Sequence, residues 1–373
     1  MVRLVKFIGY NPRGCIPSQF TGIVKYDGSE SSVRGKRLPI FSYITTQKTN
    51  KNGVPICFST DKWYSFESDS LDEGIDVTFY NGKWKPYSLV YTASGIENET
   101  FILNNLKADI NSEKYISGDF IKVFISTRYT NDGQLKDDYH LDSEWFNDVN
   151  GIFLRSNKDY LNTTSDNIHA NIYGPLERVY TISLNENKTY ELKFGNGITG
   201  KKLMPGDKIY IVYLDSDGHD GEIDLQDINF TELKIKHDYD QMRSFIPENI
   251  LKGIFGDDVF AENGSMSKMF NNEDENKRIK ISAKSIVTTQ FKEEETVEDI
   301  RDNAPSWFKT GNRLITAKDT EFYIKNYGDQ LGLAGIIDVK CMNNMQYVAS
   351  LYKWLYENGI KSKDEPSRAT ERI

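Results

Sequence analysis

Residues 179–214 alternate between apolar and polar side chains with a period of two, and no other feature of the chain constrains its fold as strongly. Apolar residues recur at every second position from Tyr180 to Leu184, and again from Tyr190 to Phe194. The sequence Asn-Glu-Asn-Lys between these runs has the composition of a turn. Alternation on both sides of a turn predicts a β-hairpin, and therefore a chain with antiparallel sheets.

A further strand is expected over residues 208–214, where both faces of the strand are apolar. A strand of this kind is either central in a sandwich or buried at a subunit contact. Two turn sequences lie between the hairpin and this strand, Gly195-Asn196-Gly197 and Pro205-Gly206-Asp207.

Short runs of aromatic and β-branched residues, separated by Gly, Asn and Asp, extend from Phe20 to about Leu214. The chain has 22 Tyr and 20 Phe residues, and aromatic side chains favour strands over flexible linkers. The strands expected in this part cover residues 21–26, 55–59, 63–66, 77–80 and 120–125. We therefore predict a mainly β fold made of short-strand, sandwich-like domains with an insertion.

After residue 291 the hydrophobic period changes from two to about 3.6, which is the period of a helix. The sequence Thr-Val-Glu-Asp at residues 296–299 has the form of a capping box and predicts a helix to about residue 308. The elements expected beyond it are a helix from a second box at residues 316–319 to Gly328, a strand over residues 333–339 and a helix over residues 344–358. An α+β C-terminal domain is therefore expected.

The net charge of −9 argues against a nucleic-acid partner, because such a partner is held by a positive field. No window approaches the roughly 18 apolar residues that span a bilayer, so no membrane insertion is expected. The start of the chain lacks the apolar stretch of a signal peptide. Cys15, Cys57 and Cys341 are far apart in sequence, which favours reduced thiols in a reducing cytoplasm.

Residues that could carry catalysis or bind a metal are sparse. None of the signatures HExxH and GxSxG occurs, and the four histidines are not spaced as metal ligands: His140, His169, His219 and His237. We therefore expect no enzymatic activity, no cofactor, no metal and no small-molecule substrate. Residues 215–222 are expected to form an ordinary acidic turn or, alternatively, a weak cation site, although their spacing departs from that of a calcium loop.

Two stretches of the sequence resemble one protein family. In residues 190–213 a strand leads into a Phe-Gly-Asn-Gly turn, and a Pro-Gly turn then leads into the next strand. This order resembles a segment of the baseplate wedge and baseplate J-like proteins of contractile-tailed bacteriophages. The matching residues are Phe194, Gly195, Asn196, Gly197, Pro205 and Gly206. Where that family usually has an Asn-Gly turn shortly afterwards, this chain has Asp220-Gly221.

Residues 297–319 resemble a second segment of the same family, with its Ile-Arg, Ala-Pro and Arg-x-Val-Thr elements in the same order. The matching residues are Ala304, Pro305, Arg313, Thr316 and Asp319. Ile315 and Thr320 depart from the Val and Tyr of the family pattern. Near the start, the sequence Ile-Gly-Tyr-Asn-Pro at residues 8–12 resembles the end of the family's N-terminal helical region.

The resemblance implies a structural subunit of a phage tail baseplate wedge, made in the host bacterial cytoplasm and located in the virion tail baseplate. It implies binding to other copies of itself and to other baseplate wedge proteins, forming the ring around the tail hub that couples host recognition to sheath contraction. Five parts are expected: a remnant of the N-terminal helical region (1–19), a central β domain (20–97 and 176–230), an inserted β domain (98–175), a linker and strand region with an exposed loop (231–290), and an α+β C-terminal domain (291–373).

The candidate subunit contacts are large side chains of the C-terminal domain. Pro305, Trp307 and Phe308 would form a docking corner or pack internally, and these two interpretations stay open at this point. Tyr347 and Trp354 lie on one face of the last expected helix and are further candidates.

An alternative function is that of a carbohydrate-binding β module of a tail fibre or adhesin. In that case Trp63 or Trp145 would stack on sugar rings. Tryptophans in such folds are more often anchors of a core or an interface, so the two functions make different demands on where these rings lie. Saturable binding on a glycan array, lost when Trp63 or Trp145 is changed to alanine, would favour the carbohydrate-binding alternative.

Overall fold

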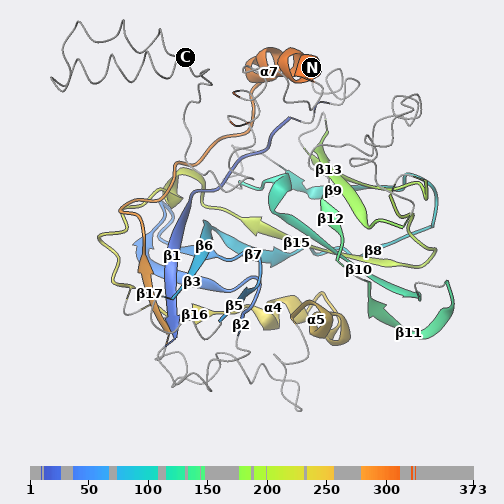
Figure 1. Ribbon diagram of the computed structural model, residues 1–373, viewed down its shortest axis with the longest axis horizontal. Coiled ribbons are helices and arrows are strands. Elements are labelled where there is room, and N and C mark those ends of the chain that lie inside the picture. Colours follow the sequence, from blue (N-terminus) through green and yellow to red (C-terminus); the bar gives the residue numbers. More distant parts are fainter. Residues whose placement is uncertain are drawn as a thin grey trace, which may run out of the picture. The chain divides into compact units, whose positions relative to one another are not determined.

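The computed structural model divides into two compact units, residues 1–301 and residues 302–373. All the strands that the structure describes belong to the first unit. The residues that the structure describes are 10, 12–26, 37–66, 74–107, 115–130, 133–142, 144–147, 176–185, 189–198, 200–230, 233–255, 279–310, 321 and 324. These residues form a mainly β structure, as the sequence predicted (Figure 1).

The first sheet has six antiparallel strands in the order β16-β3-β4-β6-β1-β17. The predicted runs 21–26, 55–59 and 77–80 are confirmed as parts of this sheet. Its strands are β1 (Gln19–Tyr26), β3 (Tyr43–Thr49), β4 (Pro55–Ser59), β6 (Ile75–Asn81), β16 (Ile235–Lys236) and β17 (Ile279–Ala283). A two-stranded ribbon, β2 (Arg37–Leu38) with β5 (Tyr64–Ser65), includes part of the predicted run 63–66.

Two further sheets contain the hairpin and the apolar strand that the sequence analysis singled out. The second sheet has the order β11-β10-β15-β7, with β8 also paired to β15. Its strands are β7 (Lys83–Pro86), β8 (Tyr91–Thr92), β10 (Ile121–Tyr129), β11 (Leu135–Leu141) and β15 (Lys208–Asp215). The third sheet has the order β12-β13-β14-β9, and its strands are β9 (Thr100–Lys107), β12 (Phe146–Asn147), β13 (Val179–Leu184) and β14 (Thr189–Phe194).

The predicted hairpin is confirmed, because β13 and β14 pair antiparallel with Tyr180 opposite Phe194 and Leu184 opposite Tyr190. The strands β9 and β10 come from the segment predicted as an insertion. They pair with β14 and β15, which come from the segment predicted as the central β domain.

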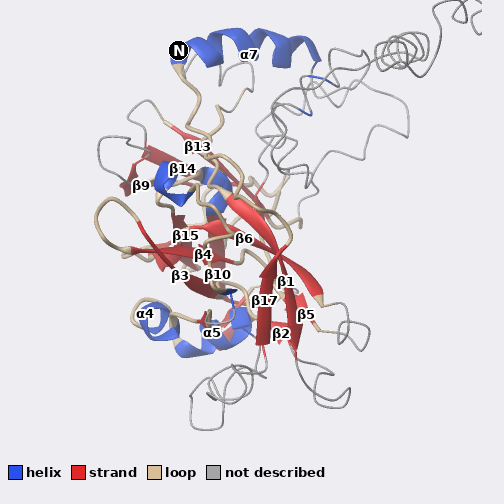
Figure 2. Cartoon of the chain, turned by 90° about the vertical axis from the view of Figure 1, so that its left-hand side faces the viewer, coloured by secondary structure: helices blue, strands red, loops and turns tan. Residues whose placement is uncertain are grey.

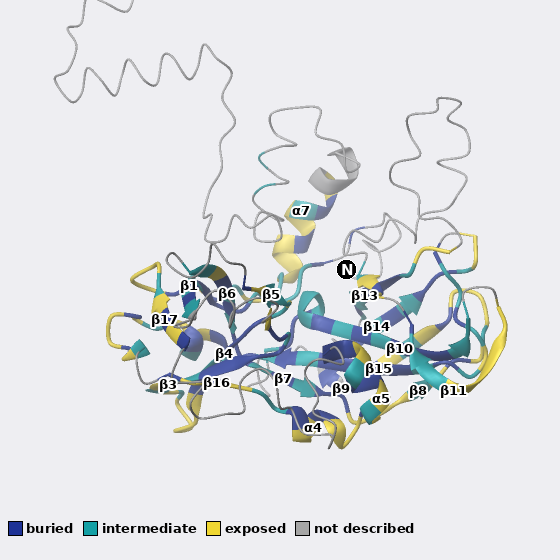
Figure 3. Cartoon of the chain, turned by 60° about the horizontal axis from the view of Figure 1, so that its bottom comes forward, coloured by how far each residue is buried: buried dark blue, intermediate teal, exposed yellow. Residues whose placement is uncertain are grey.

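Both faces of β15 are buried, so this strand is central in the fold (Figure 3). Tyr210, Val212 and Leu214 belong to a core shared with the first sheet, whereas Ile209 and Ile211 belong to a second core shared with the third sheet. Side chains alternate across a strand, so a strand whose two faces are both apolar serves two cores at once. The second sheet therefore separates the two hydrophobic cores.

Two short helices, α4 (Tyr239–Arg243) and α5 (Glu248–Phe255), lie next to each other in both views of the molecule (Figures 1 and 2). These helices were not predicted from the sequence, which indicated only a linker and one strand in this region. The apolar residues of α5 are Ile250, Leu251, Ile254 and Phe255, and all four are buried in the first core. Asn249, on the other side of α5, donates a hydrogen bond to the backbone oxygen of Tyr139 in β11.

The predicted helix after residue 296 is confirmed as α7 (Val297–Thr310). Its capping box is formed as expected: Thr296 N donates to Asp299 Oδ2 (2.9 Å), and Asp299 N donates to Thr296 Oγ1 (3.2 Å). The elements expected at residues 316–328, 333–339 and 344–358 lie outside the described residues, apart from two isolated helical positions.

Candidate functional site

The Phe-Gly-Asn-Gly turn closes on itself at the end of β14. Phe194 is fully buried, and its ring packs edge-on against Trp145 with centroids 5.5 Å apart. Gly197 N donates to Gly200 O (3.0 Å), while Asn196 Oδ1 accepts from Ile198 N (2.8 Å). A β-carbon on Gly195 would lie 2.8 Å from the α-carbon of Gly200, so only glycine fits at position 195. The motif therefore encodes a tight, closed loop.

The Pro-Gly turn joins the second sheet to the β8–β9 connection. Gly206 has a φ of 90°, a conformation that favours glycine, and it donates from its N to Ala93 O (2.8 Å). Asp207 Oδ2 accepts from Met204 N (2.9 Å) and so closes the turn, and burial raises the pKa of this carboxyl. Pro205 packs against Gly95, where a β-carbon would lie 2.6 Å from Pro205 Cγ.

A buried carboxylate that the sequence analysis did not identify, Asp142, locks the first of these turns in place. Its Oδ2 accepts from Lys201 Nζ (2.7 Å) and from Trp145 Nε1 (3.1 Å), and its Oδ1 accepts from Arg178 Nε (3.0 Å). Burial alone would raise the pKa of Asp142, but the hydrogen bonds from Arg178 and Lys201 outweigh burial and lower it. Three segments that are far apart in sequence thus meet at the carboxylate of Asp142.

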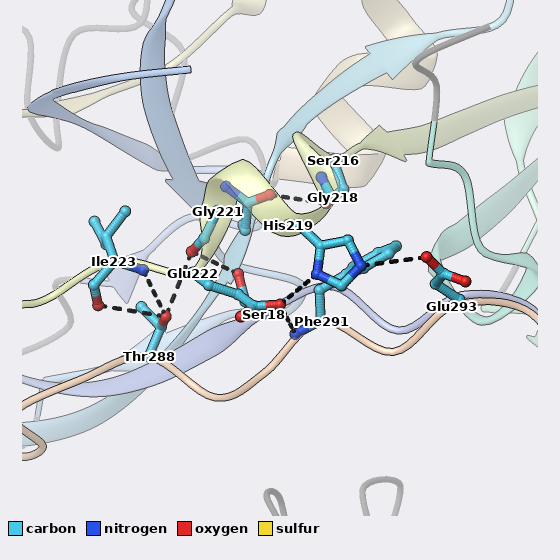
Figure 4. Close-up of polar contacts among 11 residues, drawn as sticks. Ser18, Ser216, Gly218, His219, Gly221, Glu222, Ile223, Thr288, Phe291 and Glu293 are labelled. Atoms are coloured by element: carbon cyan, nitrogen blue, oxygen red, sulfur yellow. Dashed lines mark hydrogen bonds and ion pairs between the residues drawn. The ribbon is translucent and has the colours of Figure 1, made fainter. Parts of the chain in front are cut away.

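The turn at residues 215–222 is part of a polar cluster between the first two sheets. Asn81 is fully buried, and its Oδ1 accepts from Ser216 Oγ (2.8 Å) and Asp217 N (2.9 Å). Ser18 Oγ donates to Gly221 O (2.7 Å), as Figure 4 shows. The cluster joins the residue before β1, the end of β6 and the turn after β15, so it adds hydrogen bonds to the apolar core that the two sheets share.

The same turn does not assemble a cation site. Asp217 accepts from the side-chain amides of Asn50 (2.9 Å) and Asn81 (3.2 Å), and Asp220 Oδ2 accepts from Lys51 N (3.0 Å). Glu222 Oε1 accepts from Phe291 N (3.0 Å). Each carboxylate therefore has its own donor, and no group of three or more potential ligands converges within the described ranges. Of the two interpretations, the structure favours the ordinary acidic turn.

Two of the described tryptophans are core residues. Trp145 is 5% exposed within the second core, and Trp84 is 2% exposed within the first. Trp63 is partly buried and packs against the first core. Trp145 is therefore a core anchor and is not available to stack on a sugar, because its ring packs edge-on with Phe194 and has the ammonium of Lys201 5.7 Å from its centroid.

One serine–histidine pair has the spacing of a catalytic pair but not its exposure. Ser42 Oγ lies 3.2 Å from His237 Nδ1, and Ser42 Oγ donates to Pro39 O (2.6 Å). Ser42 is fully buried, and burial lowers the pKa of His237 to about 4. The pair therefore fixes the turn before β3 and presents no nucleophile to solvent. Cys15 and Cys57 are free thiols, as expected, and burial raises the pKa of Cys15 to about 12.

The second family segment is only partly within the described residues. Ala304 is buried and Pro305 is exposed, inside α7. Trp307 and Phe308 lie in α7, but the positions of their side chains are not described, and Arg313, Thr316, Asp319, Tyr347 and Trp354 lie outside the described residues. The contact roles of these residues therefore stay predictions.

The structure adds four exposed apolar side chains that were not identified from the sequence. These side chains lie on four segments of the chain. Backbone hydrogen bonds join these segments to the Phe-Gly-Asn-Gly turn or to one another. The bonds are Asn98 N to Gly195 O (3.3 Å), Phe146 N to Arg178 O (2.9 Å) and Lys201 N to Glu177 O (2.6 Å). The exposed side chains, named here the corner patch, are Ile96 (60% exposed), Phe146 (58%), Leu176 (76%) and Ile198 (65%).

Comparison with known proteins gives little beyond this geometry. No protein-family model matches the chain, and no curated protein sequence matches it. One solved structure with a detectable likeness is a TssK-TssF-TssG baseplate subcomplex of a type VI secretion system. The alignment covers 89% of this chain and 78% of that chain at 8% identity, with a TM-score of 0.30. None of the described helices is long and apolar enough to cross a bilayer.

Proposed function

We propose that this chain is a structural subunit of a contractile-tail baseplate, and specifically a wedge subunit of a phage tail. In this proposal it associates with copies of itself and with other wedge proteins, and it carries out no catalysis. The proposal rests on the resemblance of residues 190–213 and 297–319 to baseplate wedge proteins, together with the surface that surrounds the first of these segments.

The corner patch is the observation that carries the proposal. Its four apolar side chains are exposed and lie on segments that backbone hydrogen bonds join to the family turn or to one another, and exposed apolar side chains of this kind are candidates for protein–protein contact. Three exposed glutamates, Glu97, Glu144 and Glu177, lie one or two positions from patch residues in the sequence. A partner with basic residues around an apolar centre would therefore fit this corner.

The turns next to the corner patch are suited to such a role because they are closely packed and joined by hydrogen bonds. The loop at Gly195 has no room for a β-carbon, and the Asp142 cluster ties it to the segments before β12 and β13. A contact surface that does not rearrange loses little conformational entropy on binding. The same geometry supports an assembly protein better than a carbohydrate-binding module, because two of the described tryptophan rings, Trp84 and Trp145, are buried.

The proposal can be tested by co-purification. A tagged full-length chain would be co-expressed with the other tail proteins of its phage, and the complexes would be measured by light scattering. We expect the wild-type chain to co-purify with other tail proteins. The double variant Leu176→Asp, Ile198→Asp should retain at least about tenfold less of these proteins, because burying two unpaired carboxylates at an interface is costly.

The matched control is the double variant Leu135→Asp, Ile286→Asp. Leu135 and Ile286 are 62% and 61% exposed and lie on β11 and after β17, and neither belongs to a segment whose backbone bonds define the corner patch. Retention should be unchanged in this control, and circular dichroism should show that both variants fold. A chain that stays monomeric with every tail protein, or equal retention of the two double variants, would overturn the proposal. Electron microscopy of the intact virion would test the assigned location directly.

A further inference from the structure

His219 lies between two carboxylates that belong to different segments of the chain (Figure 4). It is part of the short turn η6 (Gly218–Gly221), which follows β15. Its Nδ1 is 2.7 Å from Glu222 Oε1, and its Nε2 is 3.3 Å from Glu293 Oε1. The ring also packs edge-on against Phe291, with centroids 5.0 Å apart.

The number of hydrogen bonds that the His219 ring can donate to the two carboxylates depends on whether the ring is protonated. A neutral imidazole has one N–H group and one lone pair, whereas an imidazolium has two N–H groups. Both contacts with carboxylates are therefore hydrogen bonds only when the ring is protonated. In the neutral form one ring nitrogen directs its lone pair at a carboxylate oxygen, and that contact becomes repulsive.

The two carboxylates connect η6 to residues 288–295, which we call the strap. Glu222 Oε1 also accepts from the backbone N of Phe291 (3.0 Å), so the carboxylate that meets His219 holds the strap as well. On the same side, Thr288 Oγ1 accepts from Ile223 N (3.0 Å). His219 and Glu222 together therefore fasten the middle of the strap to the turn after β15.

The other side of the strap is attached to the start of the chain. Ile16 N donates to Lys292 O (2.8 Å) and Lys292 N donates to Ile16 O (3.0 Å), forming an isolated antiparallel bridge. Glu295 N donates to Arg13 O (3.1 Å), one residue before the capping box of α7. These bonds are between backbone groups and do not titrate. The Glu295 carboxylate adds side-chain bonds on the same side, since it accepts from the Tyr10 hydroxyl (2.7 Å) and from Arg13 N (3.1 Å). His219 is the group of the strap's attachment whose ordinary pKa lies near neutral pH.

The charged groups around the imidazole come from its own turn and from the strap. Asp217 and Asp220 on the turn accept from Asn50, Asn81 and the amide of Lys51, and the strap contributes Glu293 beside Lys292 and Glu294. Tyr115 packs against Phe291 and adds a ring rather than a charge. Glu222 and Glu293 are the carboxylates whose oxygens lie within 3.3 Å of the ring nitrogens among the described contacts.

We propose that His219, Glu222 and Glu293 form a proton-dependent clamp that fastens the strap when His219 carries a proton and releases its Glu293 contact when the proton is lost. Because the strap runs directly into α7, the clamp sets how firmly the start of that helix is anchored. The device is independent of the proposed baseplate function, since it follows from the chemistry of three side chains.

The sign of the pH dependence follows from the pKa of His219, which the hydrogen bond with Glu222 raises above its ordinary value and which Glu293 raises further. A raised pKa means that the clamp is fully closed below about pH 6.5 and opens as the pH rises through the raised value.

Hydrogen exchange with mass spectrometry of the full-length chain tests the clamp. In the wild type, peptides covering residues 288–295 should exchange about tenfold more slowly at about pH 6 than at about pH 8.5, after correction for the intrinsic rate. In His219→Gln the corrected rate should be the same at both pH values. In Glu293→Gln the pKa of His219, followed by NMR of the ring, should move down towards its ordinary value.

His140→Gln is the matched control, because His140 lies on β11 and contacts no part of the strap within the described contacts. This variant should keep the wild-type dependence on pH. Equal protection of the strap in the wild type at the two pH values would overturn the clamp. So would a pH dependence that persists in His219→Gln. Since His219 is exposed, its substitution should leave the fold intact, which the circular dichroism spectrum would verify.

Discussion

Gly221 lies so close to the side-chain amide of Asn81 that a β-carbon at position 221 would be 2.5 Å from Asn81 Oδ1. The backbone at Gly221 is not in the left-handed region, so the constraint here is space and not φ. Asn81 cannot move away freely, because its amide also bonds Ser216, Asp217 and the backbone of Cys57. The close approach thus fixes the distance between the end of β6 and the turn after β15.

Gly221→Ala should therefore lower the free energy of unfolding by about 2 kcal/mol, the usual cost of overpacking a buried site. Urea unfolding of the two proteins measures this difference. Gly53→Ala is the control, since a β-carbon at Gly53 meets nothing within 4 Å and adds only the strain of its φ of 76°. A loss at position 221 no larger than that at position 53 would contradict the packing argument.

Asp142→Asn should cost about 3 kcal/mol of stability, because it leaves Arg178 and Lys201 beside a neutral amide in a largely buried site. The control is Asp227→Asn, which removes an ion pair with Lys48 whose side chains are 61% and 42% exposed. That change should cost no more than about 1 kcal/mol. The two midpoints of urea unfolding give the comparison, and equal costs would mean that the buried cluster adds nothing to stability.

The sequence could predict those elements whose pattern is local. The hairpin of β13 and β14 was predicted because Tyr180 and Tyr190 begin two alternating runs on either side of a turn. The start of α7 was predicted because its capping residues lie three positions apart. The eight residues of α5 were missed because a helix this short gives too few turns for its period to stand out.

The polar contacts of the site could not be predicted, because their partners are distant in sequence. Asp142 and Lys201 are 59 positions apart, and His219 and Glu293 are 74 positions apart. Pairings of this kind depend on which strands become neighbours, and periodicity does not determine strand order. The corner patch was missed for the same reason, since an isolated exposed residue such as Ile96 looks in sequence like any core residue.

Acid should destabilise the protein through His237. Burial lowers the pKa of this histidine to about 4, so the unfolded chain takes up a proton between about pH 6.5 and pH 4 that the folded chain does not. The stabilisation is fully present above about pH 6.5 and is lost as the pH falls, by up to roughly 3 kcal/mol. Unfolding midpoints measured at intervals between about pH 7.5 and about pH 4.5 test how steeply the stability falls with pH.

His237→Gln is the variant that isolates this contribution, because glutamine can still bond Ser42 but does not titrate. Its stability should be lower than that of the wild type near neutral pH, and its dependence on pH should be flatter. The pKa of His219 is raised rather than lowered, so the stability that this histidine contributes is lost as the pH rises, and at higher pH than the change due to His237. Parallel curves for the wild type and His237→Gln would show that the buried imidazole is not the group responsible.

The position of β15 between two cores predicts that truncation on either face is costly. Ile211 and Val212 are adjacent, point to opposite faces and are 1% and 0% exposed. In a sheet with one solvated face, one of these two substitutions to alanine would be nearly neutral. Here Ile211→Ala should cost about 3 kcal/mol and Val212→Ala about 2 kcal/mol, through lost burial and the cavity that remains. Ile102→Ala, at a residue that is 46% exposed, should cost less than about 1 kcal/mol. If only one of the two β15 substitutions lowered the urea midpoint, one face of the second sheet would not be packed against a core.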